Sequence, residues 1–266
     1  MSGRTPEEIW EESLDEGERR LARRWPGLAA TGFAGGADVL FGILALAVTA
    51  GGLDAALPPS TAHVLASLTF GVGFVFLTVG RAELFTENFL IPVGAVFAGR
   101  AGPRGLLRMW VLTLIFNLLG LAVFAAVVSV RGVLPPEVLH AAGTMADTLG
   151  DRALLPALLS AIAAGAVMTV FTWVIAAAES GIARIAAALI VGFLLAAPSL
   201  NHAVVGFGEM IFGVLAGTSH SGWVDLVRSL GIAIVGNLIG GIGLVFTTRL
   251  AQVRSEPDST SGQRER

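Results

Sequence analysis

The sequence predicts an all-α membrane protein with six transmembrane helices. Of its 266 residues, 54% are hydrophobic and only 14% are charged, whereas soluble domains carry about 25% charged residues. Runs without a charged residue cover 109–130, 153–178 and 229–248. Each run is long enough to cross the ~30 Å hydrocarbon core of a bilayer as a helix. The mean hydropathy of +0.77 agrees with this fold class.

Composition also excludes several kinds of chemistry. The chain has no cysteine, and all 17 of its basic residues are arginine, so thiolate and lysine chemistry are both excluded. Its four scattered histidines predict no metal site. We find no phosphate loop, nucleotide motif or catalytic triad, and therefore predict neither an enzyme nor a cofactor. The net charge of −3 lies in tails and loops and indicates no nucleic-acid partner.

Residues 1–27 are predicted to form a cytoplasmic amphipathic helix on the membrane surface. Thr5, Pro6 and Glu8 have the pattern of a helix start with a capping box. Because this segment is charged rather than apolar, we expect the first span to act as its own signal. Residues 251–266 are expected to be a disordered cytoplasmic tail.

Six apolar segments make up a predicted channel domain over 28–250. They are 28–50, 62–99 with a break, 106–130, 153–178, 185–217 with a break, and 224–250. Arg100, Arg104 and Arg108 lie between the second and third segments, and the loop between the first two has no basic residue. By the positive-inside rule, both termini are predicted to be cytoplasmic.

Two polar interruptions, at 80–88 and 201–209, lie inside the second and fifth apolar segments. Polar backbone at membrane depth is tolerated only where protein buries it or where a water-filled path reaches it. The two breaks are therefore predicted to be the two halves of one permeation or binding site.

The chain also repeats itself weakly. Asn117 and Gly120 in the third segment recur as Asn237 and Gly240 in the sixth, at an offset of 120 that also overlays the first break on the second. Because a three-span repeat has an odd number of crossings, the second copy is predicted to be inverted. We expect the two asparagines to form hydrogen bonds between helices.

His202, in the second break, is the strongest candidate for a functional residue. An imidazole titrates near pH 6.5, so at a pore midpoint it can give a proton to the anion of a weak acid. The alternative is that His202 only hydrogen-bonds the backbone of the broken helix. Half-helices that end at the gap point their positive N-terminal ends toward it, which favours a small anion over a cation.

Four charged residues are predicted to form an intramembrane charge cluster: Arg81, Glu83, Glu87 and Glu209. Arg81 could attract anions, but the commoner role of such a residue is to pair with nearby carboxylates and hold irregular backbone, which we expect here. Thr86 in the same break could offer a hydroxyl to a permeant or cap the half-helix that follows.

The residues Glu83-Leu84-Phe85-Thr86 and Asn201-His202, with the Asn-x-x-Gly repeat, resemble the formate/nitrite transporter family. The resemblance covers roughly 30–250. It implies a homopentamer of aquaporin-like protomers, each with six spans of which the second and fifth are broken. It also implies that Thr86 and His202 face each other across a central chamber.

The resemblance further implies apolar constrictions in the pore. Leu84 and Phe85 would form one of them, with Leu195 facing them from the fifth span. Phe70 and Phe74 would form a cytoplasmic slit.

The chain differs from well-known anion channels of that family at four positions. Asn201 stands where those channels have a glutamate, and Gly165 where they have an asparagine that helps to bind the histidine. Arg152 is the nearest substitute for a lysine that guards the outer mouth. Arg81 occupies a position that is usually small, so the motif is similar to a divergent branch of the family.

Together these observations predict a pentameric channel or proton-coupled transporter for small monovalent anions of the formate/nitrite type, in a bacterial inner membrane. Its partners would be the anion, the lipid bilayer and other copies of the chain. One alternative is a pore for small neutral solutes. Another is a scaffold or sensor in which the charge cluster plugs the former permeation path.

Overall fold

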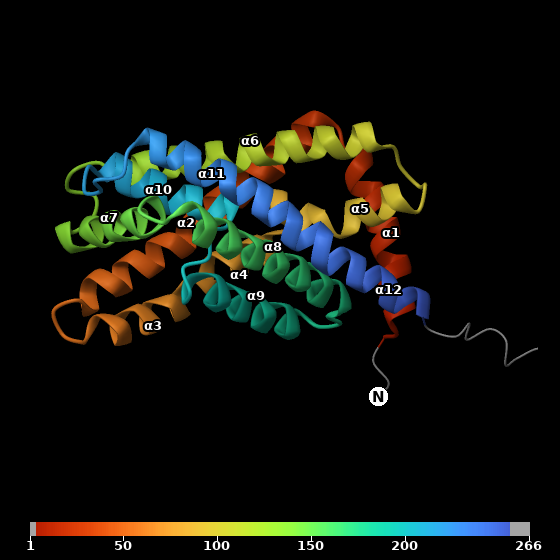
Figure 1. Ribbon diagram of the computed structural model, residues 1–266, viewed down its shortest axis with the longest axis horizontal. Coiled ribbons are helices and arrows are strands. Elements are labelled where there is room, and N and C mark those ends of the chain that lie inside the picture. The colour runs from red at the N-terminus through yellow and green to blue at the C-terminus, as the bar shows by residue number, and fades with distance from the viewer. Residues whose placement is uncertain (1–3, 256–266) are drawn as a thin grey trace, which may run out of the picture.

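The computed structural model describes residues 4–255 as a bundle of helices that lie along one long axis (Figure 1). The N-terminal helix and the last helix lie at one end of the bundle, which we call the α1 end. Helices α3, α7 and α10 reach the opposite end, which we call the α7 end.

The helices have the following bounds: α1 Pro6–Ala22, α2 Trp25–Leu53, α3 Pro59–Thr69, α4 Gly71–Gly80, the 3-10 helix η1 Phe85–Phe89, α5 Ile91–Phe97, α6 Pro103–Val128, α7 Pro136–Gly150, α8 Leu154–Ala177, α9 Gly181–Ala196, α10 Ala203–Ala216, α11 Trp223–Leu238, the π-helix η2 Ile239–Phe246, and α12 Thr247–Ser255. Five helical stretches are long and apolar enough to cross a membrane: Trp25–Leu53, Pro59–Gly80, Pro103–Val128, Leu154–Ala177 and Trp223–Ser255. Large apolar side chains such as Leu107 and Val224 cover their outer surface.

Both predicted breaks are present. The first covers 81–90, between the end of α4 and the start of α5, and includes the short helix η1. The second covers 197–202, between α9 and α10, and so begins earlier than the polar run at 201–209 suggested. Residues 203–209 are already helical, because His202 caps the N-terminus of α10 with its side chain.

One helix was not predicted. The connection 131–152, treated as a loop in the sequence analysis, contains α7. Pro136 stands at its first turn, and Val138, Ala142, Ala146 and Leu149 are buried at helical spacing. This apolar face packs on α10, so the spacing of these residues was a usable signal.

The N-terminal helix has the predicted capping box. The Thr5 hydroxyl accepts from the Glu8 backbone N–H at 3.3 Å, and a Glu8 carboxylate oxygen accepts from the Thr5 N–H at 2.9 Å. The apolar residues of α1 do not lie against a membrane surface, however. Trp10 and Leu14 are buried against the protein, where both side chains approach Gly94 of α5.

The end of the chain differs from the sequence prediction in part. Residues 251–255, expected to be disordered, form the last turns of α12. The remaining residues of the predicted tail, 256–266, lie outside the described residues.

Candidate functional site

The two breaks meet at one hydrogen bond. Thr86 Oγ1, in η1 of the first break, lies 2.6 Å from Nε2 of His202, the last residue of the second break. Both side chains are fully buried. The sequence therefore identified the two residues that join the breaks, although they are separated by more than 100 positions in the chain.

The contacts of His202 assign its protons. Its Nδ1 accepts a hydrogen bond from the backbone N–H of Val205 at 3.1 Å, which caps α10. Nδ1 therefore carries no proton, and the neutral ring carries its proton on Nε2. His202 then donates to the Thr86 hydroxyl, whose own hydrogen is free to bond a solute. A second proton on the ring would have to displace the cap on Nδ1.

Asn117, on α6, fixes the backbone of the first break. Its Oδ1 accepts from the N–H of Phe85 at 2.9 Å. Its Nδ2 donates to the carbonyl oxygens of Gly32, at 2.7 Å, and Glu83, at 2.9 Å. One amide thus ties the break to α6 and α2.

Asn237, on α11, makes the corresponding contacts in the second break. Its Oδ1 accepts from the N–H of Ala203 at 2.9 Å. Its Nδ2 donates to the carbonyl oxygens of Ala161, at 2.8 Å, and Asn201, at 3.1 Å. The two asparagines were expected to join helices, and they also hold the broken backbone, which the sequence did not indicate.

These contacts correct the sequence overlay of the two breaks. Glu83 corresponds to Asn201, and Phe85 to Ala203, at an offset of 118 rather than 120. The stretch from Glu83 to Asn117 is 34 positions long and that from Asn201 to Asn237 is 36, so a single offset cannot align the whole chain.

Two glycines allow these close approaches. A methyl group at Gly36 of α2 would collide with the backbone carbonyl of Asn117. A methyl group at Gly165 of α8 would collide in the same way with that of Asn237. Gly165 therefore leaves no room for a larger side chain at this position.

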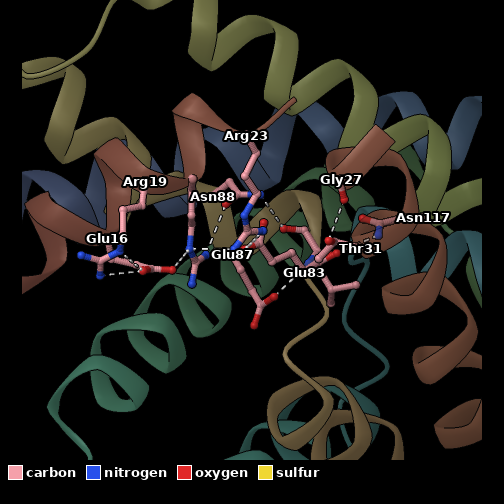
Figure 2. A network of polar contacts seen from close by, with 11 residues as sticks. Glu16, Arg19, Arg23, Gly27, Thr31, Glu83, Glu87, Asn88 and Asn117 are labelled. Atoms are coloured by element: carbon pink, nitrogen blue, oxygen red, sulfur yellow. Dashed lines mark hydrogen bonds and ion pairs between the residues drawn. The ribbon is translucent and has the colours of Figure 1, made fainter. Parts of the chain in front are cut away.

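Charges from α1 reach the first break (Figure 2). Oε1 of Glu83 lies 2.6 Å from Arg23 Nη1 and 3.4 Å from Arg20 Nε. Oε2 of Glu87 accepts from the backbone N–H of Leu84 at 2.8 Å. Arg20 also donates to the side-chain oxygen of Asn88 at 3.5 Å. The N-terminal helix thus supplies the cations that compensate a buried carboxylate, a role that sequence reasoning missed.

The same network changes the acidity of groups on α1. Burial lowers the pKa of Arg20, but the carboxylates of Glu83 and Glu16 outweigh burial, so its pKa is raised overall. Burial raises the pKa of Glu16, and the hydrogen bonds and charges of Arg20 and Arg19 outweigh it in turn, so its pKa is lowered. Both groups are therefore charged at neutral pH.

The pairing predicted for Arg81 is wrong. Arg81 ends α4 in the left-handed conformation, with φ of 57°, and no ion pair in the described part of the chain includes it. Arg20 and Arg23 take the place beside Glu83 instead. Arg81 lines a cavity of about 410 Å³ at the α1 end, together with Glu83 and Glu87.

The predicted cluster of four charges is also divided. Glu209 does not lie with Arg81, Glu83 and Glu87, because it is nearly two turns into α10 and lines a different cavity, at the α7 end. The structure therefore has a charged network beside the first break and one isolated carboxyl beyond the second.

The predicted constriction residues are buried. Leu84, Phe85 and Leu195 are at most 3% exposed and belong to one continuous apolar core. Phe70 and Phe74 are fully buried and stack edge to face, with ring centres 5.7 Å apart. Their assignment to pore constrictions stays a prediction.

Asn201 turns away from the Thr86–His202 pair. Its Oδ1 accepts from the Ser229 hydroxyl at 3.3 Å, and its backbone N–H donates to Ser160 Oγ at 3.0 Å. It therefore holds the second break and does not contact Thr86. Within residues 4–255, no group of three or more potential ligands is placed to hold a metal ion.

The fold and the site define a multi-pass helical membrane protein of the channel and transporter class. Residues 7–251 match the family model described as formate/nitrite transporter. Because this match covers most of the sequence, the chain belongs to the formate/nitrite transporter family. Members of this family are channels and transporters, so the protein is not an enzyme.

Three curated relatives show how far the similarity extends. The inner membrane protein YfdC of Escherichia coli is 26% identical over 93% of this chain and 79% of its own length. The formate channel BtFdhC of Bacillus thuringiensis is 24% identical over 92% of this chain and 94% of its own. A probable formate transporter of Methanothermobacter thermautotrophicus is 32% identical over 79% of this chain and 74% of its own.

Solved structures share the fold. An "FNT family ion channel" superposes with a TM-score of 0.78 at 19% identity, covering 94% of this chain and 99% of the other. A "pentameric formate channel with formate bound" superposes with a TM-score of 0.69 at 16% identity, covering 86% and 98%.

Proposed function

We propose that the protein is a channel or proton-coupled transporter for small monovalent anions of the formate/nitrite type. The observation that carries the proposal is the 2.6 Å contact between Thr86 Oγ1 and His202 Nε2, which joins the two breaks in the buried centre of the bundle. The names of the curated relatives, a formate channel and a probable formate transporter, support an anion of this type.

The proposal includes an arrangement in the membrane. We infer six spans in two inverted halves, with α3, α4, η1 and α5 as the second span and α9 with α10 as the fifth. The matching contacts of Asn117 and Asn237 support two equivalent halves. Likeness to a pentameric channel supports a homopentamer, and similarity to YfdC supports an inner-membrane location. Both termini are placed in the cytoplasm by the arginine distribution.

In this mechanism, His202 acts first as a hydrogen-bond donor. A bare anion cannot enter a low-dielectric region without a large free-energy penalty. The apolar residues Leu84, Phe85 and Leu195 exclude the water of a hydrated ion. The Nε2–H of His202 and the Thr86 hydroxyl are the polar groups that replace this water between the breaks.

The test is solute flux into proteoliposomes under a pH gradient, with formate and nitrite compared with glycerol and water. Anion uptake that follows the gradient supports the proposal. In His202→Asn, the amide oxygen still caps α10, but the side chain no longer reaches Thr86, so anion uptake should fall by on the order of tenfold. His220→Asn, at an exposed histidine, is the matched control.

Two outcomes would contradict the proposal. Unchanged formate uptake and pH dependence in His202→Asn would remove His202 from the mechanism. No flux of any solute through a well-folded pentamer would favour a plugged, non-transporting protein.

A pore for small neutral solutes is the second candidate function. One observation favours it: no hydrogen bond in the described part of the chain joins a charged side chain to Thr86 or His202, so the central pair is neutral. Neutral permeation does not respond to voltage. Glycerol flux that is independent of the membrane potential, without formate flux, would establish this function.

A further inference from the structure

A second cavity, of about 210 Å³, lies at the α7 end of the bundle and plays no part in the contacts described above. The ends of α2 and α3, the length of α7, and parts of α9 and α10 form its wall. Glu209 projects into it from α10, seven residues after His202. At a rise of 1.5 Å per residue, this spacing is about 10 Å along the helix.

Glu209 differs from Glu83 and Glu87, the glutamates of the first break, in having no hydrogen-bond or ion-pair partner among the described residues. It is 6% exposed, yet no hydrogen bond or ion pair joins its carboxyl to any residue among 4–255. Glu83, which is equally buried, is bound by two arginines, and Glu87 accepts a backbone N–H. A buried carboxylate without a partner is unfavourable, and binding a proton removes the unfavourable charge.

The charged and titratable groups that face Glu209 come from every neighbouring element at this end. They are Asp54 from the end of α2, His63 from α3, Glu137 and His140 from α7, and Arg152 from the turn after α7. Among the described residues, no arginine lines the cavity itself. Carboxylates in the lining raise the local concentration of protons and so favour the protonated, neutral form of Glu209.

Arg152 is close but is already bound. Its guanidinium donates to Ser160 Oγ at 2.8 Å and to the carbonyl oxygen of Ser199 at 3.0 Å. Burial lowers the pKa of Arg152, and the charge of Glu209 opposes this shift. The field of Glu209 therefore reaches the second break. A proton on Glu209 would leave the positive charge of Arg152 uncompensated and able to attract an anion into the cavity.

We propose that Glu209, and not His202, exchanges the proton that neutralises the permeant anion, and that this exchange takes place in the cavity at the α7 end. This inference rests on the proposed function. An oxygen of the anion takes the proton from the Glu209 carboxyl, so an O–H bond forms on the permeant as the one on Glu209 breaks. The neutral acid passes to the Thr86–His202 pair, and the Glu209 carboxylate regains a proton from a hydronium ion of the acidic solution on the α7 side.

The geometry of His202 is consistent with this division of roles. Its Nδ1 is bound to the Val205 N–H, so the ring can donate through Nε2 without changing its protonation. Glu209 has no such bond to lose when its proton leaves or returns.

The experiment compares Glu209→Gln with Glu179→Gln, which removes an exposed carboxylate that lines neither cavity. Formate uptake and the accompanying internal pH change are measured in proteoliposomes with an acidic outside solution. Glu209→Gln should lower uptake by on the order of tenfold or more and abolish its pH dependence. Glu179→Gln should behave as the unmodified protein.

Glu209→Asp keeps the exchangeable proton, so it should keep the pH dependence at a reduced rate. If Glu209→Gln does not fold, the pH dependence of uptake by Glu209→Asp tests the proposal by itself. The inference is overturned if uptake by Glu209→Gln keeps its pH dependence or if uptake by Glu209→Asp loses it. It is also overturned if Glu209→Gln lowers glycerol or water flux as much as formate flux. If the unmodified protein itself moves no anion, the proposed function fails, and this result is distinct from a failure at Glu209 alone.

Discussion

The two breaks in the helix bundle are held by different kinds of contact. In the first break, Glu83 is bound by Arg20 of α1 and by Arg23, which directly follows α1, a helix that is not among those long and apolar enough to cross a membrane. In the second, Asn201 is held by the neutral hydroxyls of Ser160 and Ser229, which lie on adjacent spans. The difference indicates that the first break depends on the docking of α1, whereas the second break is complete within the spans.

What the breaks share is an asparagine that bonds three backbone groups, and its loss should have the largest effect. Asn117→Leu or Asn237→Leu leaves one N–H and two carbonyl oxygens without partners in the buried core. We expect each substitution to destabilise the protein by about 3 kcal/mol or more. Thermal unfolding of the purified protein in detergent measures the change.

Thr113→Val is the matched control for the asparagine variants. Thr113 lies one turn before Asn117 on α6, and its buried hydroxyl has no hydrogen-bond partner among residues 4–255. Removing this hydroxyl should leave stability unchanged or raise it. If only one of the two asparagine variants is destabilised, the two breaks are not held equivalently.

Glu83→Gln should destabilise the first break and leave the second unchanged. It removes the carboxylate that binds Arg20 and Arg23, and we expect a loss of about 2 kcal/mol because these ion pairs are largely buried. Hydrogen exchange should rise in α1 and in residues 81–90 and stay unchanged in residues 197–202. Arg24→Gln, beside Arg23 but without an ion pair in the described residues, serves as the control. Faster exchange in both breaks would show that α1 supports the whole site.

The smallest expected effect is a pH response at the α7 end, away from both breaks. Hydrogen bonding to Asp151 and the charge of Asp147 raise the pKa of exposed His220 above its usual value near 6.5. Because the pKa is higher in the folded state, the stabilisation is complete below the unfolded value and is lost as pH rises through the folded one. The protection of amide hydrogens in residues 217–222, measured relative to their intrinsic exchange rate at each pH, should therefore decrease on alkalinisation. Asp151→Asn should weaken this response, and an identical pH profile in Asp151→Asn would contradict the assignment.

Much of the fold could be predicted from the sequence, because transmembrane helices leave long uncharged runs. Each run appears as a helix in the structure, such as α8 at 154–177. The polar residues inside such runs located both breaks. Thr86 and His202 were identified through a family resemblance, and the structure places them in contact.

Other features depend on contacts that leave no local pattern. Nothing in the sequence around Arg23 indicates that it pairs with a glutamate 60 positions away. Arg81, which is closest in sequence to that glutamate, ends a helix in a left-handed turn and does not pair with it. The close approach that Gly165 allows could likewise not be predicted, because it depends on the path of the Asn237 backbone on another helix.

The docking of α1 also sets an order of events during synthesis. The helix packs on α5, which is made roughly 75 residues later. At a translation rate of about 5–20 residues per second, α1 waits on the order of 4–15 seconds for its partner. During this interval the apolar side of Trp10 and Leu14 is uncovered beside the ribosome and the bilayer surface. The amphipathic pattern of residues 6–22 therefore serves two stages. In the nascent chain the apolar side chains can contact lipid, and in the folded protein the same side chains pack on α5.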